Sequence, residues 1–248
     1  MPPAARTLPL PRALRDAGLQ RYGFHGLSCE SIVRQLGDVL PGRLIIAHLG
    51  NGASSTAVHK GISIDTSMGL TPTGGLIMGT RSGDLDPGLL VHLMREMKLD
   101  AAAIEDLVDH RSGLLGVSGV SADMRALHDA AASNRDVRLA IEMFCYRVAK
   151  ELGAMSIALG GVDQIVFTGG IGEHDARVRS EVCTRLSSLG VELDEARNQG
   201  GLGLLSRDGS RCTVQVLSSH EDEQIARHTW ELCGGSAPRC PALRRLSA

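Results

Sequence analysis

The fold of this chain is decided by the stretch Leu44-Ile45-Ile46-Ala47-His48-Leu49-Gly50-Asn51-Gly52-Ala53-Ser54-Ser55-Thr56-Ala57-Val58. An apolar run enters Gly-Asn-Gly and a run of small and apolar residues leaves it, which predicts a β-hairpin with strands at 43–49 and 53–59. Asn51 and Gly52 tolerate positive φ, and glycine leaves the backbone N–H groups uncovered. Such a turn can hold a phosphate, with His48 and Asn51 as further polar groups. We therefore expect a nucleotide-phosphate site at this turn.

A second glycine cluster favours the same interpretation. In Phe167-Thr168-Gly169-Gly170-Ile171-Gly172-Glu173-His174, a buried strand over 164–168 meets a glycine turn and the start of a helix. This order points helix N–H groups and the positive end of the helix dipole outward, where they favour an anion. The spacing lacks the third glycine of the dinucleotide-binding fingerprint. Alone, the cluster is explained by a tight strand–helix turn; beside the first turn, it favours one bound nucleotide.

Further polar residues have roles that the local sequence leaves open. Arg81 lies on the glycine-flanked loop Gly79–Asp84, where a guanidinium can neutralise a phosphoryl group, although a surface salt bridge is the more usual role of an arginine. His25 stands among glycines, either facing a ligand or satisfied within the core. Ser121 is expected to cap a helix. Glu221 opens an acidic helix start, which is usually solvated but can also attract Mg²⁺.

Helices alternate with strands along the rest of the chain, which predicts an α/β domain. The loop 66–85 is long, and long loops without structure of their own tend to be functional. The other expected elements are a helix capped by Ser28 and ending at Gly37, a third strand at 62–65, helices beginning after Asp86, Asp100, Asn134 and Gly172, a strand at 213–217 and a helix from Glu221.

Three segments are expected from the composition along the chain. Residues 1–20 are rich in proline and arginine and are expected to be extended. Residues 21–233 are expected to form the nucleotide-binding domain. Residues 234–248 lack periodicity and are expected to be a disordered tail.

Composition excludes several classes of function. The net charge of −2 provides no field to attract nucleic acid or an anionic membrane, and no apolar run approaches the length of a membrane span. The six cysteines show no C-x-x-C spacing, and the nine histidines show no H-x-x-x-H spacing. Zinc sites and a secreted disulfide framework are therefore not expected. We expect reduced thiols in a cytoplasm instead.

Taken in order, these motifs closely resemble the acetate kinase family, which includes propionate kinases. The resemblance runs from about Leu10 to about Arg227 and is carried by long, specific segments. It implies a mixed sheet with flanking helices, one of the two lobes of the actin-like fold (ribonuclease H-like) shared with sugar kinases and the Hsp70 ATPase. It also implies phosphorylation of acetate or propionate by ATP with Mg²⁺, and a homodimer. The matching segments are Arg21–Gly26, His48–Val58, Asp65–Pro87, Gly113–Arg125 and Phe167–Glu173.

The resemblance assigns roles to residues of this chain by position. Two positions depart from the family pattern: His174, where the family more often has asparagine, and Ser218-Ser219-His220, where it usually has Pro-Thr-Asn. The implied roles are catalytic for His25 and Arg81, phosphate-binding for His48, Leu49, Gly50, Asn51 and Gly52, adenosine-binding for Asp123, Met124, Arg125, Gly170, Ile171, Gly172, Glu173 and His174, carboxylate-binding for Pro72 and Mg²⁺-binding for Glu221.

Some parts of the family pattern have no match in this sequence. The family chain opens with an N-x-G-S-S-S phosphate turn, and it carries a substrate arginine and a catalytic aspartate before the position of Met1. The sequence is therefore expected to represent the second, nucleotide-binding lobe almost alone. Two hypotheses follow: a phosphotransferase of acetate kinase type, or a catalytically inactive ATP-binding or dimerisation fragment. A sugar kinase-like or Hsp70-like ATPase would not explain the segments Arg21–Gly26 and Met78–Pro87.

Overall fold

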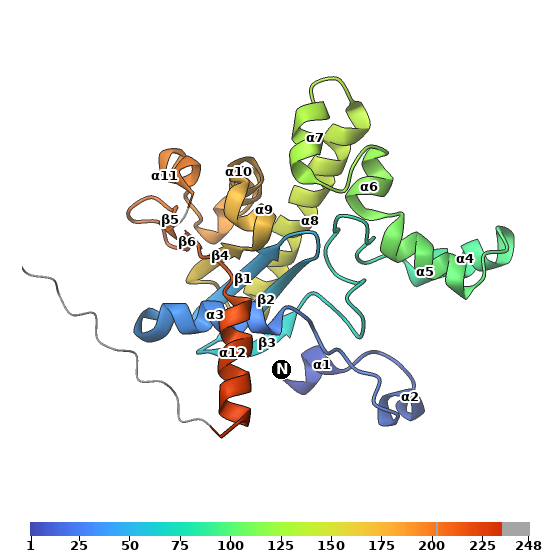
Figure 1. Ribbon diagram of the computed structural model, residues 1–248, viewed down its shortest axis with the longest axis horizontal. Coiled ribbons are helices and arrows are strands. Elements are labelled where there is room, and N and C mark those ends of the chain that lie inside the picture. Colours follow the sequence, from blue (N-terminus) through green and yellow to red (C-terminus); the bar gives the residue numbers. More distant parts are fainter. Residues whose placement is uncertain (202, 235–248) are drawn as a thin grey trace, which may run out of the picture.

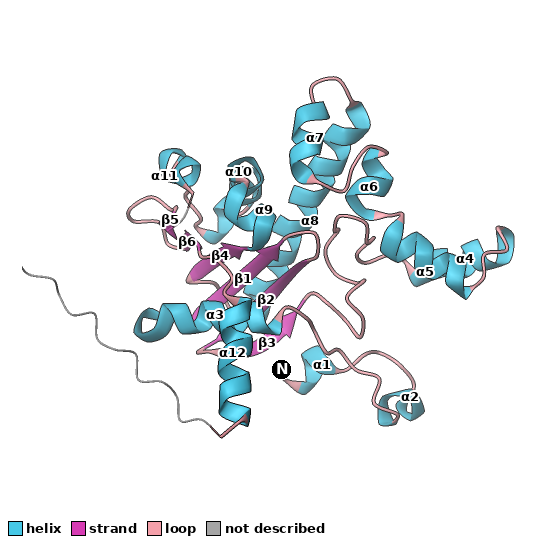
Figure 2. Ribbon diagram, viewed as in Figure 1, coloured by secondary structure: helices cyan, strands magenta, loops and turns pink. Residues whose placement is uncertain are grey.

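A mixed β-sheet forms the centre of the molecule, with helices on both of its faces (Figures 1 and 2). The structure is a computed structural model and describes residues 1–201 and 203–234. Within these residues the six strands lie in the order β3-β2-β1-β4-β6-β5. Their bounds are Arg43–Leu49 for β1, Ala53–His59 for β2, Ile62–Thr66 for β3, Gln164–Thr168 for β4, Gly203–Leu204 for β5 and Thr213–Val216 for β6.

The predicted hairpin is confirmed at both of its strands. β1 and β2 are antiparallel, with Leu49 opposite Ala53 and Arg43 opposite His59, and β3 continues the antiparallel meander. On its other side, β1 pairs in parallel with β4, which pairs in parallel with β6. Because β1 and β4 are parallel neighbours, their carboxyl ends meet at one edge of the sheet. The two glycine turns of the sequence follow these two ends.

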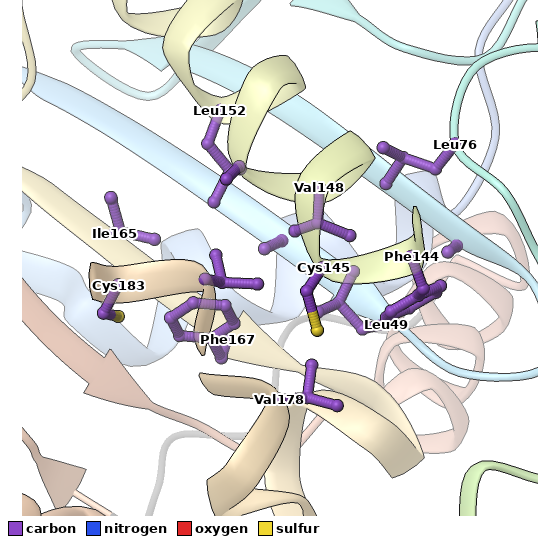
Figure 3. Packing of buried hydrophobic residues seen from close by; sticks show 14 of the residues in the cluster. Leu49, Leu76, Phe144, Cys145, Val148, Leu152, Ile165, Phe167, Val178 and Cys183 are labelled. Carbon is purple, nitrogen blue, oxygen red and sulfur yellow. The ribbon is translucent and has the colours of Figure 1, made fainter. Parts of the chain in front are cut away.

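Side chains of β1 alternate between two cores, which explains why this strand is apolar almost throughout. Leu44 and Ile46 pack with Ile32 and Leu36 of α3 (Gly26–Leu36) on one face. Ile45, Ala47 and Leu49 belong to the larger core on the other face, beneath the long helix α8 (Arg135–Leu159). Figure 3 shows Phe144, Cys145, Val148 and Leu152 of α8 in this larger core, together with Leu49, Leu76, Ile165, Phe167, Val178 and Cys183.

Helix ends follow the capping pattern of the sequence. Asp86, Asp100 and Asn134 each accept hydrogen bonds from backbone N–H groups of the helix that follows, as predicted. Gly160 ends α8 in the left-handed conformation. The remaining helices are α1 (Pro3–Arg6), α2 (Arg12–Asp16), α4 (Pro87–Glu96), α5 (Ala101–His110), α6 (Gly113–Ser118), α7 (Met124–Ala130), α9 (Gly169–His174), α10 (Ala176–Arg185), α11 (Glu195–Gly200) and α12 (Glu221–Leu232), with 3₁₀ turns at Gly37–Val39 and Ser187–Leu189.

The structure corrects several expectations. Residues 1–20 are not extended throughout, because α1 and α2 interrupt them; a proline at the first helical position costs no hydrogen bond, so Pro3 can begin a helix. The helix expected to be capped by Ser28 begins earlier, at Gly26. The helix after Asp86 has no buried residue and projects with α5 away from the sheet (Figure 1).

Two further points concern the ends of the chain and the membrane. The expected tail falls, after Gly234, outside the described residues. Within the described part of the chain, no helix combines the length and the apolar character that crossing a membrane requires. The α/β class, with a mixed sheet and flanking helices, is confirmed.

Candidate phosphate and nucleotide site

The two glycine turns form one surface at the carboxyl ends of β1 and β4. Gly169 has a φ of +79°, and a Cβ at this position would lie 2.8 Å from the carbonyl oxygen of Leu49 and 3.2 Å from Nε2 of His48. A Cβ on Gly50 would lie 3.8 Å from the backbone N of Gly170. At position 169 only glycine permits this approach of one turn to the other, because of both the positive φ and the short contact. The structure therefore brings together the turns that the sequence suggested as one site.

The hairpin loop differs from the expected turn. The loop contains three residues, and the N–H of Gly50 donates to the carbonyl of Gly52 at 3.0 Å. None of these three residues has a positive φ, so the expected use of Asn51 and Gly52 in the left-handed region is wrong. Space is tight at position 52 instead: an added Cβ would lie 3.2 Å from Nη2 of Arg81 and 3.4 Å from Nε2 of His25, so the Arg81 side chain would have to shift.

Arg81 and His25 thus converge on Gly52 from two different loops. Nη1 of Arg81 donates to the carbonyl of Pro72 at 2.8 Å, which leaves Nη2 toward Gly52. His25 lies at the start of α3 with a φ of 58°, a conformation uncommon for residues other than glycine and found often at functional sites. Its Nδ1 is 2.9 Å from Oγ of Ser54, so Nε2 is the nitrogen on the side of Gly52. The two predicted catalytic residues are adjacent in the structure.

His48 lies against His25 and has its own hydroxyl partner. Nδ1 of His48 is 2.9 Å from Oγ of Ser28, a fully buried residue inside α3. Burial, as the main cause, and the neighbouring His48, as the second cause, lower the pKa of His25 to about 4. Burial also lowers the pKa of His48. Both imidazoles are therefore neutral near pH 7, and each can donate one hydrogen bond without carrying a charge.

The loop that carries Arg81 is held by the start of α6. The N–H of Met78 donates to the carbonyl of Arg81 at 3.1 Å, and the N–H of Leu114 donates to the carbonyl of Met78 at 2.9 Å. Gly113 has a φ of +64°, and the carbonyl of Met78 occupies the space that its Cβ would need. The N–H of Gly79 donates to the carbonyl of Asn51 at 3.1 Å, which joins this loop to the hairpin.

The first expected adenosine wall is the start of α7. Asp123, rather than Ser121, caps this helix, and its carboxylate accepts from the N–H of Arg125 at 2.9 Å. The Arg125 side chain bonds the same carboxylate and lowers the pKa of Asp123. Met124 is buried in the core, so its side chain does not face a ligand. Ala122, just before the cap, lies beside Gly79 and brings this wall to the phosphate loop.

The second expected wall is α9. Gly170 and His174 are exposed, whereas Gly172 is buried and Ile171 packs against the core. The Glu173 carboxylate accepts from the N–H of Gly169 at 3.0 Å and from the N–H of Ser219 at 3.2 Å. Oε1 of Glu173 thus ties the turn together, and the N–H of Gly169 is not free for a phosphate.

Glu221 begins α12, and α12 lies beside α3 (Figure 1). The hydroxyl of Ser219 donates to Oε1 of Glu221 at 3.3 Å, and the charge of Glu221 acts on His25, where it opposes the lowering of the pKa. The described residues contain no cluster of three metal-binding side chains. Mg²⁺ in nucleotide sites is commonly held by one or two carboxylates together with the phosphates, and Glu221 fits that smaller role.

Some residues of the site were missed by sequence reasoning. Ser28 and Ser54 orient the two histidines, and Arg21 holds the start of the 66–85 loop by donating to the carbonyls of Thr66 and Met68 at 2.7 and 3.2 Å. Arg179 of α10 is 1% exposed and donates to the carbonyls of Gly172 and Glu173, both at 2.9 Å. These partners are distant in sequence or belong to backbone, so no local motif reveals them.

Comparisons with known proteins show the family of the chain. The sequence matches the Acetokinase family over residues 1–227. Acetate kinase of Rhodopseudomonas palustris (strain TIE-1) is 47% identical over 242 residues, which cover 95% of this chain and 60% of that protein. Acetate kinase of Methylocella silvestris is 48% identical over 227 residues, 90% of this chain and 56% of that protein. The chain thus spans about 60% of the length of the curated relatives it matches.

Solved structures show the same relationship. The crystal structure of Porphyromonas gingivalis acetate kinase matches with a TM-score of 0.89 and 42% identity, covering 94% of this chain and 61% of that one. A propionate kinase from Francisella tularensis matches with a TM-score of 0.87 and 37% identity, covering 92% of this chain and 60% of that one. The family match across most of the sequence, and relatives at this identity, show that the chain belongs to the acetokinase family.

Proposed function

We propose that the chain binds ATP with Mg²⁺ at its two glycine turns and takes part in transferring the terminal phosphoryl group to a short-chain carboxylate. The overall reaction is acetate plus ATP to acetyl phosphate plus ADP. The observation that carries this proposal is the convergence of Nε2 of His25 and Nη2 of Arg81 on Gly52. Relatives named acetate kinase and propionate kinase support the same reaction class.

The geometry suits phosphoryl transfer, which depends mainly on positioning and on charge stabilisation. The bond to the carbonyl of Pro72 fixes the Arg81 side chain. Its Nη2 therefore faces Gly52 without a further loss of side-chain entropy when a ligand binds. In the tautomer whose Nδ1 accepts from the Ser54 hydroxyl, His25 presents Nε2–H as a neutral donor. Together they supply one charged and one neutral donor to the oxygens of a phosphoryl group beside Gly52.

Magnesium would be held by Glu221 together with the phosphates, and it would neutralise part of their negative charge. The loops of the chain do the remaining work: the hairpin loop carries the phosphates, and the segments at α7 and α9 flank the adenosine. Pro72 is exposed beside Arg81, on the side where the carboxylate would approach. Acetate and propionate are both candidate acceptors.

The test measures binding and turnover separately. Calorimetric titration of the 248-residue chain with Mg-ATP is expected to show saturable binding. Acetyl phosphate, trapped as the hydroxamate, is expected to form only with acetate or propionate present. Arg81→Ala should retain most of the binding but lower the transfer rate by roughly 10²–10³, the usual cost of losing one charge-stabilising donor. Arg177→Ala, an exposed arginine on α10, is the matched control.

A second candidate is nucleotide binding without turnover by this chain alone. The observation that favours it is coverage: the chain spans 60% of the Rhodopseudomonas palustris acetate kinase, so the rest of that enzyme has no counterpart among these residues. Charge stabilisation from one side of a cleft cannot by itself orient the acceptor or exclude water. Saturable Mg-ATP binding with no hydroxamate would support this candidate. Absence of binding would contradict both.

A homodimer and a cytoplasmic location complete the proposal. The projecting helix α4 exposes apolar side chains, at 40% for Leu89, 46% for Val91 and 45% for Met94, and Met97 directly after it is 62% exposed, which supports association of two copies. Light scattering after gel filtration is expected to give twice the monomer mass, and Met94→Glu to give the monomer, with His92→Glu on the same helix as control.

The free cysteines suit a reducing compartment, where ATP is abundant.

A further inference from the structure

The two expected adenosine walls are linked by a pair of side chains to which the proposed reaction gives no role. His128 lies in α7, one turn after the cap at Asp123, and Asp175 follows directly after α9. Nε2 of His128 is 2.8 Å from Oδ2 of Asp175. The pair therefore bridges the α7 wall and the α9 wall across 47 positions of sequence.

This bridge is more buried than the other ion pairs of the described residues. The side chains of His128 and Asp175 are 16% and 12% exposed, whereas the pair His228–Glu30, with a similar separation of atoms, is 46% and 47% exposed. Partial burial excludes competing water, so such a hydrogen bond holds its geometry better than a surface pair does. Asp175 is itself fixed, because its other oxygen, Oδ1, accepts from the N–H of Val178 at 3.0 Å as the cap of α10.

The α9 wall is held independently on its other side. Arg179 donates to the carbonyls of Gly172 and Glu173, and its Nε donates to Oδ1 of Asn198 at 2.8 Å. Asn198 is fully buried and belongs to α11. The α7 wall packs on α8 through the core residues Met124 and Leu127, and the His128–Asp175 pair joins this wall to the fixed α9.

We propose that His128 and Asp175 are positioning residues that set the separation of the two walls and thereby the affinity for the nucleoside part of the nucleotide. This inference rests on the proposed function, since it takes the space between α7 and α9 as the adenosine site. The phosphate loop touches both walls, but its own attachments do not include the bridge: the N–H of Gly79 donates to the carbonyl of Asn51, and Gly50 approaches the backbone N of Gly170. Removing the bridge should therefore weaken nucleoside binding and spare phosphate binding, because the walls must then be ordered by the ligand.

The test compares two ligands that share phosphates but differ in the nucleoside. The 248-residue chain is titrated with Mg-ATP and with Mg-tripolyphosphate by calorimetry. His128→Ala is expected to weaken the binding of Mg-ATP by about tenfold, the usual size of a lost hydrogen bond to a charged group. The affinity for Mg-tripolyphosphate is expected to stay within about twofold of the wild type, because the phosphate loop does not depend on the bridge.

Asp175→Ser separates the bridge from the helix cap. A serine side chain still accepts from the N–H of Val178 and caps α10, but it is too short to reach His128. This variant should match His128→Ala, and the double variant should show no additional loss, since the same bond is removed twice. His128→Gln keeps a donor toward Asp175 and is expected to recover most of the affinity. His92→Ala, an exposed histidine on α4, is the control.

Each outcome of the titrations either supports or overturns the positioning role of His128 and Asp175. Variants that keep the wild-type affinity for Mg-ATP would overturn the positioning role, as would an equal loss for both ligands, which indicates general damage to the site. A loss in His128→Ala that His128→Gln does not restore would also overturn it. If the wild type binds tripolyphosphate but not ATP, the proposed function fails and this inference fails with it. Selective loss for ATP in both single variants supports it.

Discussion

The imidazole rings of His25 and His48 stack with their centroids 4.1 Å apart and their planes inclined by 19°. Each ring is held from its edge by a serine hydroxyl, Ser54 for His25 and Ser28 for His48. Two imidazolium ions could not remain at this separation without strong repulsion. The stack therefore exists in its neutral form, with the pKa of both histidines lowered by burial.

Acidification from pH 6.5 to about pH 4 is expected to destabilise the protein through His25. An unfolded histidine binds a proton near pH 6.5, whereas the pKa of His25 in the folded chain is about 4. Within this window the unfolded state holds more protons, so the free energy of unfolding falls as the pH falls. Above pH 6.5 both states are neutral and below about pH 4 both are protonated, so this contribution is constant on either side.

The variant His25→Asn measures this contribution. Asparagine keeps a polar group for Ser54 but does not titrate, so the urea midpoint of the variant should change less between pH 6.5 and pH 4 than that of the wild type. His92→Asn, on the exposed face of α4, should follow the wild type. Parallel curves for His25→Asn and the wild type would show that His25 is not the group responsible.

Gly113→Ala is expected to destabilise the protein through a clash with the Arg81 loop. Gly113 and Gly119 have the same φ of +64°, but a Cβ on Gly113 would meet the carbonyls of Met78 and Arg81, whereas nothing lies within 4 Å of one on Gly119. Gly119→Ala should cost about 1 kcal/mol for its backbone conformation alone. Gly113→Ala should cost at least about 2 kcal/mol more, as overpacking does. Equal losses in urea unfolding would contradict the clash.

Arg179→Ala is expected to cost about 3 kcal/mol of stability, because it leaves buried acceptors without donors. These are the carbonyls of Gly172, Glu173 and Asn198 and the side-chain oxygen of Asn198. Arg177→Ala, an exposed neighbour on the same helix, should change the free energy of unfolding by no more than about 0.5 kcal/mol. A similar small change at both positions would mean that the surrounding structure relaxes to satisfy the acceptors.

Glu221→Gln is expected to weaken the binding of ATP in the presence of Mg²⁺ by about tenfold and to leave the binding of ATP in EDTA unchanged. The amide keeps the shape of the side chain, including an oxygen for the Ser219 hydroxyl, but loses the charge that favours the cation. Asp222→Asn, the next residue in the first turn of α12, is the matched control. An equal loss with and without Mg²⁺ would assign Glu221 a role in the protein rather than at the metal.

Much of the fold could be predicted from local sequence because short-range signals define it. The Gly-Asn-Gly loop and its flanking runs fix the register of β1 and β2, and the stripe from Val137 to Leu159 defines α8. Short helices such as α6 were not predicted, since they are held by bonds from Ser112 and Leu114 to the distant Arg81 loop. The apolar periodicity of α4 predicts one apolar face, but none of its residues is buried, because periodicity does not specify what a helix packs against.

The parts of the candidate site that local backbone motifs form could be predicted from the sequence. The parts that depend on contacts between distant segments could not. The glycine-rich turns could be found in the sequence, and the structure brings these two halves of the proposed phosphate site together. Ser28 was expected to cap a helix, because a serine near a helix start usually does so; here its hydroxyl is directed at His48 instead. Glu173 is assigned to the adenosine site by resemblance alone, and the sequence gives no sign that its Oε1 accepts from backbone N–H groups on two segments.

The parallel pairing of β1 with β4 also has a consequence for the order of folding. The β1–β2 hairpin pairs residues that are close in sequence. The pairing of β1 with β4 joins Leu44 to Gln164, which lies 120 positions further along the chain. Local contacts form before long-range ones, because closing a long loop costs more chain entropy. We expect the hairpin to be an early structure and the docking of β4 to be a late one. A nascent or partly folded chain would then expose the first glycine turn of the proposed nucleotide site and acquire the second only in the final cooperative step.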